Sequence, residues 1–262
     1  MNKKLKSLFA IPLFAILSYG SSHVFAVPIL GQELSSFAVL GGSTVTNTGP
    51  TILTGNLGTS PGSAITGFFG TNENDGPGVF SGTAYQAVPF SSTAHNQLGD
   101  AISSLDGLAF TSDLTGQDLG GLTLNPGVYN FDTSAQLTGI LNLNNSDPNA
   151  IFVFNIGTTL TTASGSIVIE TNSFVDNVFW NVGSSATLGT NSFFKGNILA
   201  DQSITLTTGA TIIHGRALAH NGAVTMDTNQ ISVVPEPQTY AMLLAGISLL
   251  GFMVHRRKAT AV

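Results

Sequence analysis

The residues that decide the fold are SATLGT at positions 185–190, because they return eighteen positions later as SITLTT at 203–208. The segment FKGNILA at 194–200 is likewise echoed nineteen positions later by IHGRALA at 213–219. A repeat of nearly twenty residues in β-prone sequence is typical of a solenoid, whose coils stack because none can bury its apolar side alone. The repeats therefore predict a chain wound into stacked β-coils.

Apolar and polar residues alternate within each repeat, as in Ile204, Thr205 and Leu206. A period of two places Ile204 and Leu206 toward the interior and Thr205 toward solvent. Stacking aligns equivalent outward residues in rows at the strand spacing of about 4.8 Å. The sequence therefore predicts a flat, regular row of threonines on the outside of the solenoid.

Charge is scarce and unevenly distributed along the 262 residues. Charged residues make up 8% of the chain, against about 25% in an average protein. Lys195 and Arg216 are the basic residues between the two ends, whereas thirteen of the fourteen acids fall between Glu33 and Asp227. An acidic middle argues against nucleic acid as a partner, since phosphate binding needs clustered Lys and Arg. We expect Lys195 and Arg216 to be surface residues that neutralise nearby carboxylates.

The sequence offers few candidates for catalysis or metal binding. Cysteine is absent from the chain, which excludes thiolate zinc sites and cysteine nucleophiles. His214 and His220 stand six apart without a Cys or an acid triad nearby, so we expect corner residues and no metal site. None of the carboxylates stands in an acidic motif that can be assigned to the pair that polysaccharide hydrolysis requires. We therefore expect no enzyme activity and no cofactor, with polysaccharide cleavage as a minor alternative.

The first 26 residues read as a secretory signal peptide. A lysine-rich start precedes a short apolar run, and Ala26 and Val27 flank the expected cleavage site for signal peptidase. The alternative is a short membrane anchor, but the apolar run falls short of the roughly 20 residues that a span requires. We therefore expect export.

The C-terminal segment has the three parts of a sorting signal. Pro235, Glu236 and Pro237 precede a short apolar run, and the basic residues Arg256 and Arg257 follow it. This arrangement resembles the PEP-CTERM signal of Gram-negative bacteria. The resemblance implies processing by an exosortase, transient inner-membrane association through a short transmembrane helix, and a destination at the cell surface or outside the cell. A permanent tail anchor is the alternative with the same physical pattern.

Five separated motifs point to one family. They are FAVL at 37–40, TNTGP at 46–50, GNLGTSPGSAITGF at 55–68, LNPGVY at 124–129 and NAIFVF at 149–154. In this order they resemble the ice-binding-protein-like family of bacteria, fungi and algae. The resemblance covers residues 29–232 and implies a discontinuous, three-faced, right-handed β-helix. In that fold the N-terminal coil pairs beside the C-terminal coils, and one long α-helix lies along a face.

The residue pattern supports a helix in one place. Ala94, Leu98, Ile102 and Leu105 form a single apolar stripe at helical spacing. The dipeptide at 106–107, Asp-Gly, is expected to end the helix. The helix either begins near Pro89 or kinks there, because proline is tolerated in the first turn and disrupts a helix interior. We thus expect a signal peptide at 1–26, a solenoid domain at 27–233 and a sorting segment at 234–262.

The family resemblance also implies a binding face. Some members carry a Thr-Ala/Gly-x-Thr/Asn motif on the surface that contacts ice, and Thr208, Gly209 and Thr211 match it in the run TGAT. Partial matches begin at Thr190, Thr171 and Thr162, which we expect along the same face. A bulky charged residue in place of Thr208 or Thr211 is expected to abolish ice binding.

Two functions remain open from the sequence. The first is an exported ice-binding protein that adsorbs to ice through its threonine face. The alternative is an exosortase-sorted adhesin or biofilm protein that binds extracellular polysaccharide or matrix and has no role with ice.

Overall fold

The computed structural model describes residues 29–71, 76–147, 150–172 and 177–233. The expected signal peptide and the sorting segment, with its proposed transmembrane helix, lie outside these residues. Among the helices of the described part, none has the length and apolar character needed to cross a membrane.

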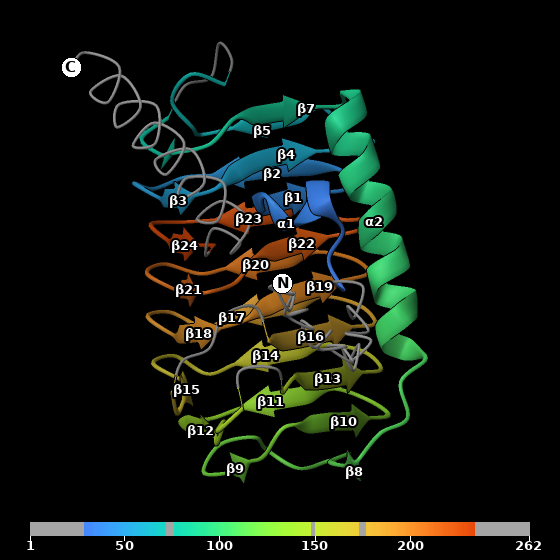
Figure 1. Cartoon of the computed structure of the whole chain (residues 1–262). Coiled ribbons are helices and arrows are strands. Elements are labelled where there is room, and N and C mark those ends of the chain that lie inside the picture. Colours follow the sequence, from blue (N-terminus) through green and yellow to red (C-terminus); the bar gives the residue numbers. More distant parts are fainter. Residues whose placement is uncertain (1–28, 72–75, 148–149, 173–176, 234–262) are drawn as a thin grey trace, which may run out of the picture.

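The chain winds around three parallel sheets, and successive strands pass from the first sheet to the second and then to the third (Figure 1). Sheet A runs in the order β7 (Ala84–Gln86), β4 (Asn56–Thr59), β1 (Phe37–Gly41), β22 (Ala217–Ala219), β19 (Asn197–Ala200), β16 (Val178–Val182), β13 (Phe152–Ile156), β10 (Gly127–Phe131) and β8 (Ser112–Asp113). Sheet B runs in the order β11 (Ala135–Leu137), β14 (Leu160–Thr162), β17 (Ala186–Leu188), β20 (Ile204–Leu206), β23 (Val224–Met226), β2 (Thr44–Asn47) and β5 (Ala64–Thr66). Sheet C runs in the order β6 (Val79–Phe80), β3 (Ile52–Thr54), β24 (Gln230–Ser232), β21 (Thr211–Ile213), β18 (Phe193–Lys195), β15 (Ile167–Glu170), β12 (Ile140–Leu143) and β9 (Thr123–Leu124). The expected mainly-β, three-faced solenoid is confirmed.

The stack is discontinuous in sequence. The first coil, β1 to β3, lies inside the stack near one end, and the chain then builds toward that end through β4 to β7 (Figure 1). A long helix, α2 (Pro89–Asp106), carries the chain to the opposite end, from which the coils build back. The last coil then meets the first, because β22 pairs with β1, β23 with β2 and β24 with β3.

The interior is filled by inward residues stacked along the solenoid axis. Tyr129, Phe154 and Trp180 occupy one register position in β10, β13 and β16. Their rings stack at centroid distances of 5.4 and 4.0 Å, and Phe194 adds a tilted contact at 4.7 Å. The indole N–H of Trp180 donates to the carbonyl of Lys195 at 2.9 Å. Repeated burial of one position thus produces a continuous core.

Helix α2 covers sheet A. It begins at Pro89, which confirms a start near this proline over a kink there, and Gly107 is its C-cap. Its buried residues include Ala94, Leu98 and Leu105 as the pattern indicated, while Ala101 is buried where the pattern favoured the half-buried Ile102. A second hydrophobic cluster joins this stripe to outward residues of sheet A, namely Phe37, Leu40, Val153, Phe179, Leu199 and Leu218. Sheet A is therefore buried on both sides.

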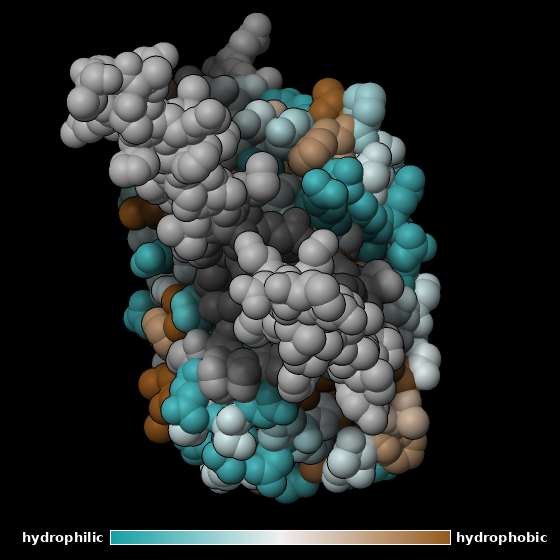
Figure 2. All heavy atoms as spheres, in the orientation of Figure 1, coloured by the Kyte–Doolittle hydropathy of each residue, from teal (hydrophilic) through white to brown (hydrophobic). Residues whose placement is uncertain are grey.

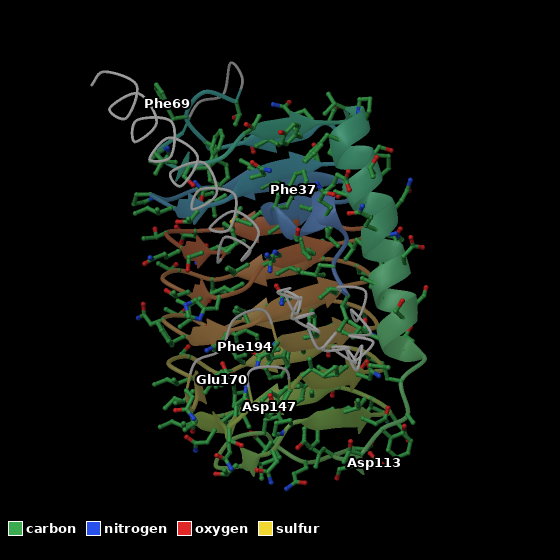
Figure 3. All side chains as sticks on the ribbon, in the orientation of Figure 1. Phe37, Phe69, Asp113, Asp147, Glu170 and Phe194 are labelled. Carbon is green, nitrogen blue, oxygen red and sulfur yellow. The ribbon has the colours of Figure 1, made fainter. Side chains whose placement is uncertain are left out.

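The short helix α1 (Gln32–Ser35) closes the same region. Leu34 is fully buried, and its backbone N–H donates to the side chain of Gln97 on α2 at 2.9 Å. Phe37, at the start of β1, packs against Tyr85 and Phe90 at centroid distances of 5.6 and 5.8 Å (Figure 3). These contacts fix the N-terminal segment between α2 and the stack.

Arg216 is not the surface residue that the sequence suggested. Its side chain is fully buried between β21 and β22. Its Nε and one terminal nitrogen donate to the carbonyl of Ser35 at 2.9 and 2.6 Å, and the other donates to Asn197 Oδ1 at 2.7 Å. Arg216 thus ties the last coil to the end of α1, just before β1. The guanidinium satisfies a carbonyl at the C-terminal end of α1, which has no partner within the helix.

Lys195 is also buried, with 2% of its surface exposed, and it forms an ion pair with the buried Glu170 (Figure 3 labels Glu170). Asn145 and Asn177 each donate to Glu170 Oε1, at 2.8 and 2.9 Å. The expectation of a surface lysine is therefore wrong. The pairing is the reason a charge can be accommodated inside the coil.

Two histidines connect α2 to a corner of the solenoid. His95 of α2 and His220, just after β22, stack with ring centroids 4.5 Å apart. His95 Nε2 lies 2.8 Å from the carbonyl of His220, and Asp201 lies 3.9 Å from His220 Nδ1. Burial and the neighbouring His95 lower the pKa of His220 below its ordinary value, and Asp201 opposes the shift. His220 is a corner residue, as expected from the sequence.

Replacing Arg216 with Met is expected to reduce the free energy of unfolding by about 3 kcal/mol, because the carbonyl of Ser35 and the amide of Asn197 lose buried hydrogen bonds. Denaturant unfolding measures the loss. The exposed corner residue Gln202, changed to Met, is the control and is expected to stay within about 0.5 kcal/mol. A similar small change in both variants would contradict the role given to Arg216.

Stability is expected to fall as the pH drops below about 6.5, the ordinary pKa of histidine, toward the lower pKa of folded His220. In that window the unfolded chain takes up the proton first, so the unfolded state is favoured. Denaturant unfolding at pH 7.5 and 5.5 measures the difference, and His220→Gln is expected to reduce it. An unchanged pH dependence in this variant would contradict the assignment.

Candidate functional site

Sheet B carries one unbroken row of outward threonines. The pairing register aligns one outward residue of each strand with its neighbours along the sheet. We call this set the threonine row, and in spatial order it consists of Thr161, Thr187, Thr205, Thr225, Thr46 and Thr66. Gln136 continues the row beyond Thr161. Parallel strands in register repeat at about 4.8 Å, so the row is a periodic array.

The threonine row points outward because its neighbours in each strand point inward. Ile204 and Leu206, on either side of Thr205, are 0% and 1% exposed. Thr161 and Thr225 are exposed, and the other four threonines of the row are half-buried between their neighbours. None of the strands of sheet B contains a charged residue. The row is therefore a neutral surface of methyl and hydroxyl groups on a firmly packed backbone.

The junction between the first and last coils lies inside this row. Thr225 belongs to the last coil and Thr46 to the first, and the two are direct partners in the β23–β2 pairing. The two residues are far apart in sequence, yet the register carries the row across the junction without a break. The length of the array therefore depends on the pairing of the first coil with the last.

The other two faces are different. Sheet A is covered by α2, and its outward residues contact the helix. Sheet C exposes a mixed row in which Ile52, Thr211, Phe193 and Ile140 differ in size and polarity. Ile52 is 53% exposed and Phe193 is 41% exposed. Figure 2 shows brown, apolar atoms along the left edge, where the strands of sheet C lie in Figure 1.

Polar side chains mark the corner between sheets B and C. Thr208 donates from Oγ1 to Asp227 Oδ2 at 2.5 Å, and Thr190 and Thr207 lie 3.3 Å apart through their hydroxyls. Hydrogen bonds from Thr208 and then Thr228 lower the pKa of Asp227. Asp227 is thus charged at neutral pH and lies at the rim of sheet B, outside the threonine row.

The structure does not place the six residues of the expected binding face together. Thr190, Thr208 and Gly209 lie at the corner between sheets B and C, whereas Thr211 is on strand β21 of sheet C. The TGAT motif therefore turns a corner and spans two faces.

The other two expected residues are also elsewhere. Thr171 follows β15 and is exposed at the next corner, after sheet C. Thr162 is 3% exposed, and its Oγ1 accepts the N–H of Gly189 at 2.8 Å. The prediction of one shared face is therefore wrong for these positions, since a linear motif does not show where the chain bends.

The threonine row itself had a sequence signal. The alternation around Thr205 predicts an outward threonine, and equivalent triplets occur at Thr187 and Thr225. Thr46 and Thr66 also follow an apolar residue, but Asn47 and Gly67 come after them, and no residue pattern shows that the first coils continue the row begun by the last ones. The structure supplies that connection through the pairing of β2 with β23.

Two family matches cover most of the chain. Residues 39–232 match the ice-binding-like family, and residues 233–258 match the PEP-CTERM protein-sorting motif. An ice-binding protein of Nostoc sp. (strain HG1) is 49% identical over 270 residues, covering 98% of this chain and 97% of the relative.

Similar solved structures are also those of ice-binding proteins. The crystal structure of an ice-binding protein from the Antarctic ascomycete Antarctomyces psychrotrophicus superposes with a TM-score of 0.73 at 38% identity, over 78% of this chain and 98% of that one. An ice-binding protein from an Antarctic biological consortium gives 0.73 at 40% identity, over 79% and 91% of the two chains. The chain therefore belongs to the ice-binding-like family and carries a PEP-CTERM sorting motif.

Proposed function

We propose that this protein binds ice and that the threonine row of sheet B is the surface of contact. The observation that carries the proposal is the in-register alignment of six threonines on six adjacent strands of sheet B, whose strands contain no charged residue. The relatives named as ice-binding proteins support ice as the ligand.

The chemistry of the row suits an ordered water surface. Each threonine offers a hydroxyl that hydrogen-bonds to water and a methyl group that water must surround. A periodic array of such groups imposes a repeated pattern on the water between protein and crystal. The β-branched side chains have restricted χ1 angles and stand on packed strands, so little conformational entropy is lost on binding.

The absence of charge from the strands of sheet B also supports the proposal. Ionised groups hold hydration water in their own geometry and would compete with an ice-like arrangement. Described acids lie at the edges of sheet B: Asp227 is at the corner with sheet C, and Asp118 bridges Gln136 beyond the end of the threonine row. Sheet C has no comparable regularity, because its outward row mixes apolar, aromatic and polar residues: Ile140, Ile167, Phe193, Thr211, Gln230 and Ile52.

The sorting motif at 233–258 supports export. We propose that residues 1–26 are removed by signal peptidase and that the C-terminal segment is processed by an exosortase after transient membrane association. The protein would then act at the cell surface or outside the cell. The last described strand, β24, belongs to sheet C and not to the sheet that carries the threonine row.

A second candidate function is favoured by the same motif. Sorting to the surface suits an adhesin or matrix component, which would use the solenoid as a rigid scaffold without contacting ice. The family is not one of enzymes, and a catalytic role is not proposed. Loss of surface attachment on deletion, with unchanged survival of freezing, would favour this second function.

The test compares two matched substitutions. Thr205→Tyr places a bulky ring in the middle of the threonine row, and Thr211→Tyr places the same ring on sheet C. Both threonines are half-buried outward strand residues, and tyrosine has a high β-propensity, so both variants are expected to fold. Ice recrystallisation inhibition and crystal shaping are measured against the unmodified protein.

We expect Thr205→Tyr to need about tenfold more protein for the same inhibition, because the ring holds neighbouring threonines away from the crystal. Thr211→Tyr is expected to behave as the unmodified protein. Loss of activity in Thr211→Tyr alone would mean that the binding surface includes the TGAT motif and not the threonine row. No activity in any of the three folded proteins would move the proposal to the second candidate function.

A further inference from the structure

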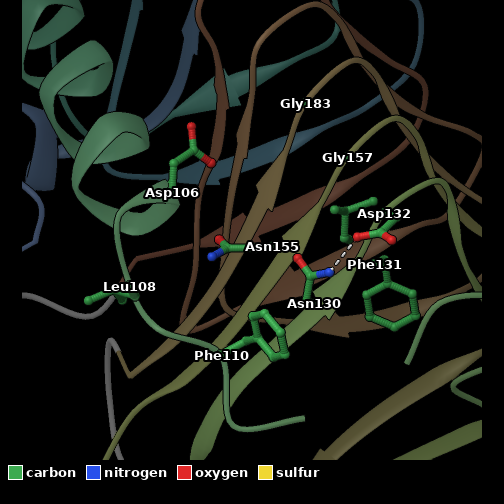
Figure 4. A pocket seen from close by; sticks show the side chains of 10 residues that line it. Asp106, Leu108, Phe110, Asn130, Phe131, Asp132, Asn155, Gly157 and Gly183 are labelled. Carbon is green, nitrogen blue, oxygen red and sulfur yellow. Dashed lines mark hydrogen bonds between the residues drawn. The ribbon is translucent and has the colours of Figure 1, made fainter. Parts of the chain in front are cut away.

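A pocket of about 450 Å³ lies where α2 ends, on the side of the solenoid that carries sheet A (Figure 4). The helix stops at Asp106, and the chain passes through Leu108 and Phe110 to reach β8. Strands β10 and β13 form the floor through Asn130 and Asn155. The pocket belongs to a different face from the threonine row, so the proposed ice binding does not account for it.

The floor of the pocket is an asparagine ladder. Asn130, Asn155 and Asn181 occupy one register position on β10, β13 and β16. Asn155 donates to the carbonyl of Leu105 at 2.9 Å, which satisfies a group at the helix end. Asn181 donates to Asp106 Oδ1 at 2.6 Å and to Asn155 Oδ1 at 3.2 Å. These hydrogen bonds hold the amides in fixed orientations.

The outer part of the ladder retains hydrogen-bonding capacity. Asn130 Nδ2 donates to Asp132 Oδ1 at 2.8 Å, which fixes both side chains beside the opening (Figure 4). A carboxylate accepts about four hydrogen bonds, and an amide oxygen accepts two. Asp132 is exposed and Asn130 is half-buried, so their oxygens are positioned to accept hydroxyl hydrogens from a ligand.

Apolar side chains form the opposite wall. Phe110 is 60% exposed and Leu108 is 38% exposed. An exposed aromatic ring beside fixed amides and carboxylates gives a platform that can bury an apolar face while hydroxyl groups at the ligand's edge meet polar partners. This combination matches a sugar ring, which has C–H faces and an equator of hydroxyls.

The charge of the pocket further restricts the class of ligand. Its lining includes Asp106 and Asp132 and no basic residue, which disfavours sulfated, phosphorylated or uronic polymers. Across the described residues, no three His, Cys, Asp or Glu side chains gather in a way that could hold a metal ion. We propose that this pocket binds a pyranose unit of a neutral polysaccharide, with Phe110 as the stacking platform and Asn130 and Asp132 as hydroxyl acceptors.

Glycan binding at this pocket is separate from ice binding and gives the solenoid a second binding site on another face. A protein bound to a glycan through this pocket would keep sheet B free. The two activities are therefore separable by substitution.

The test is affinity electrophoresis of the full chain through gels that contain dextran, a soluble β-1,3-glucan or a galactomannan, with polygalacturonate as the anionic comparison. Phe110→Ala removes the platform, and Asp132→Asn tests the carboxylate. Phe69→Ala is the matched control, since Phe69 is 70% exposed and lies at the other end of the molecule (Figure 3).

We expect at least one neutral polymer to retard the protein, and Phe110→Ala to weaken this binding about tenfold. Phe69→Ala is expected to bind as the unmodified protein does. Three results would overturn the proposal: no retardation by any neutral polymer, equal weakening in both phenylalanine variants, or retardation by polygalacturonate alone. Circular dichroism of each variant shows that folding is retained.

Discussion

The closure between the first and last coils is the constraint on which the structure depends. Strand β1 lies between β4 and β22, so the solenoid is continuous in space although the chain enters it between two other coils and not at an end. Arg216 secures this closure by donating two hydrogen bonds to the carbonyl of Ser35, at the entrance to β1. The same closure pairs Thr46 with Thr225 and thereby extends the threonine row from the coils of the last repeats into the first ones.

The three faces differ because their outward residues differ in type and in how far they are covered. Helix α2 buries the outward residues of sheet A, and the chain that leaves the helix forms the pocket beside Phe110. Sheet C exposes apolar residues of unequal size. Sheet B alone among the three described sheets combines regular spacing, small polar side chains and strands without charge. The proposed ice contact follows from that combination and from membership of the ice-binding-like family.

The sequence predicts most of the fold because local patterns determine it. Alternation around Thr205 indicates strands, and the apolar stripe with Gly107 gives the end of α2 correctly. The burial of Arg216 and Lys195 could not be predicted, because their partners Ser35 and Glu170 are brought near them by the stacking of coils. Charge scarcity suggested surface positions, whereas the coil interior supplies matched acceptors for both side chains.

The binding face shows a similar limit. The TGAT match at 208–211 is a real sequence feature, but the chain turns a corner within it, so Thr208 and Thr211 end on different sides. Thr162 was expected on the binding face as a partial match to the same motif, whereas it is buried and its Oγ1 accepts the N–H of Gly189. The register between neighbouring coils decides which threonines align. This register depends on how the coils stack, which the sequence motif does not show.

The most direct test of this account is adsorption of the fluorescently labelled protein to a single ice crystal, with one lysine substitution on each side of the coil junction. Thr205→Lys lies in the last coils and Thr46→Lys in the first, and both residues belong to the threonine row. The account predicts that each variant alone loses adsorption while Thr211→Lys, on sheet C, retains it. Adsorption that survives both row substitutions, in folded protein, would contradict the account.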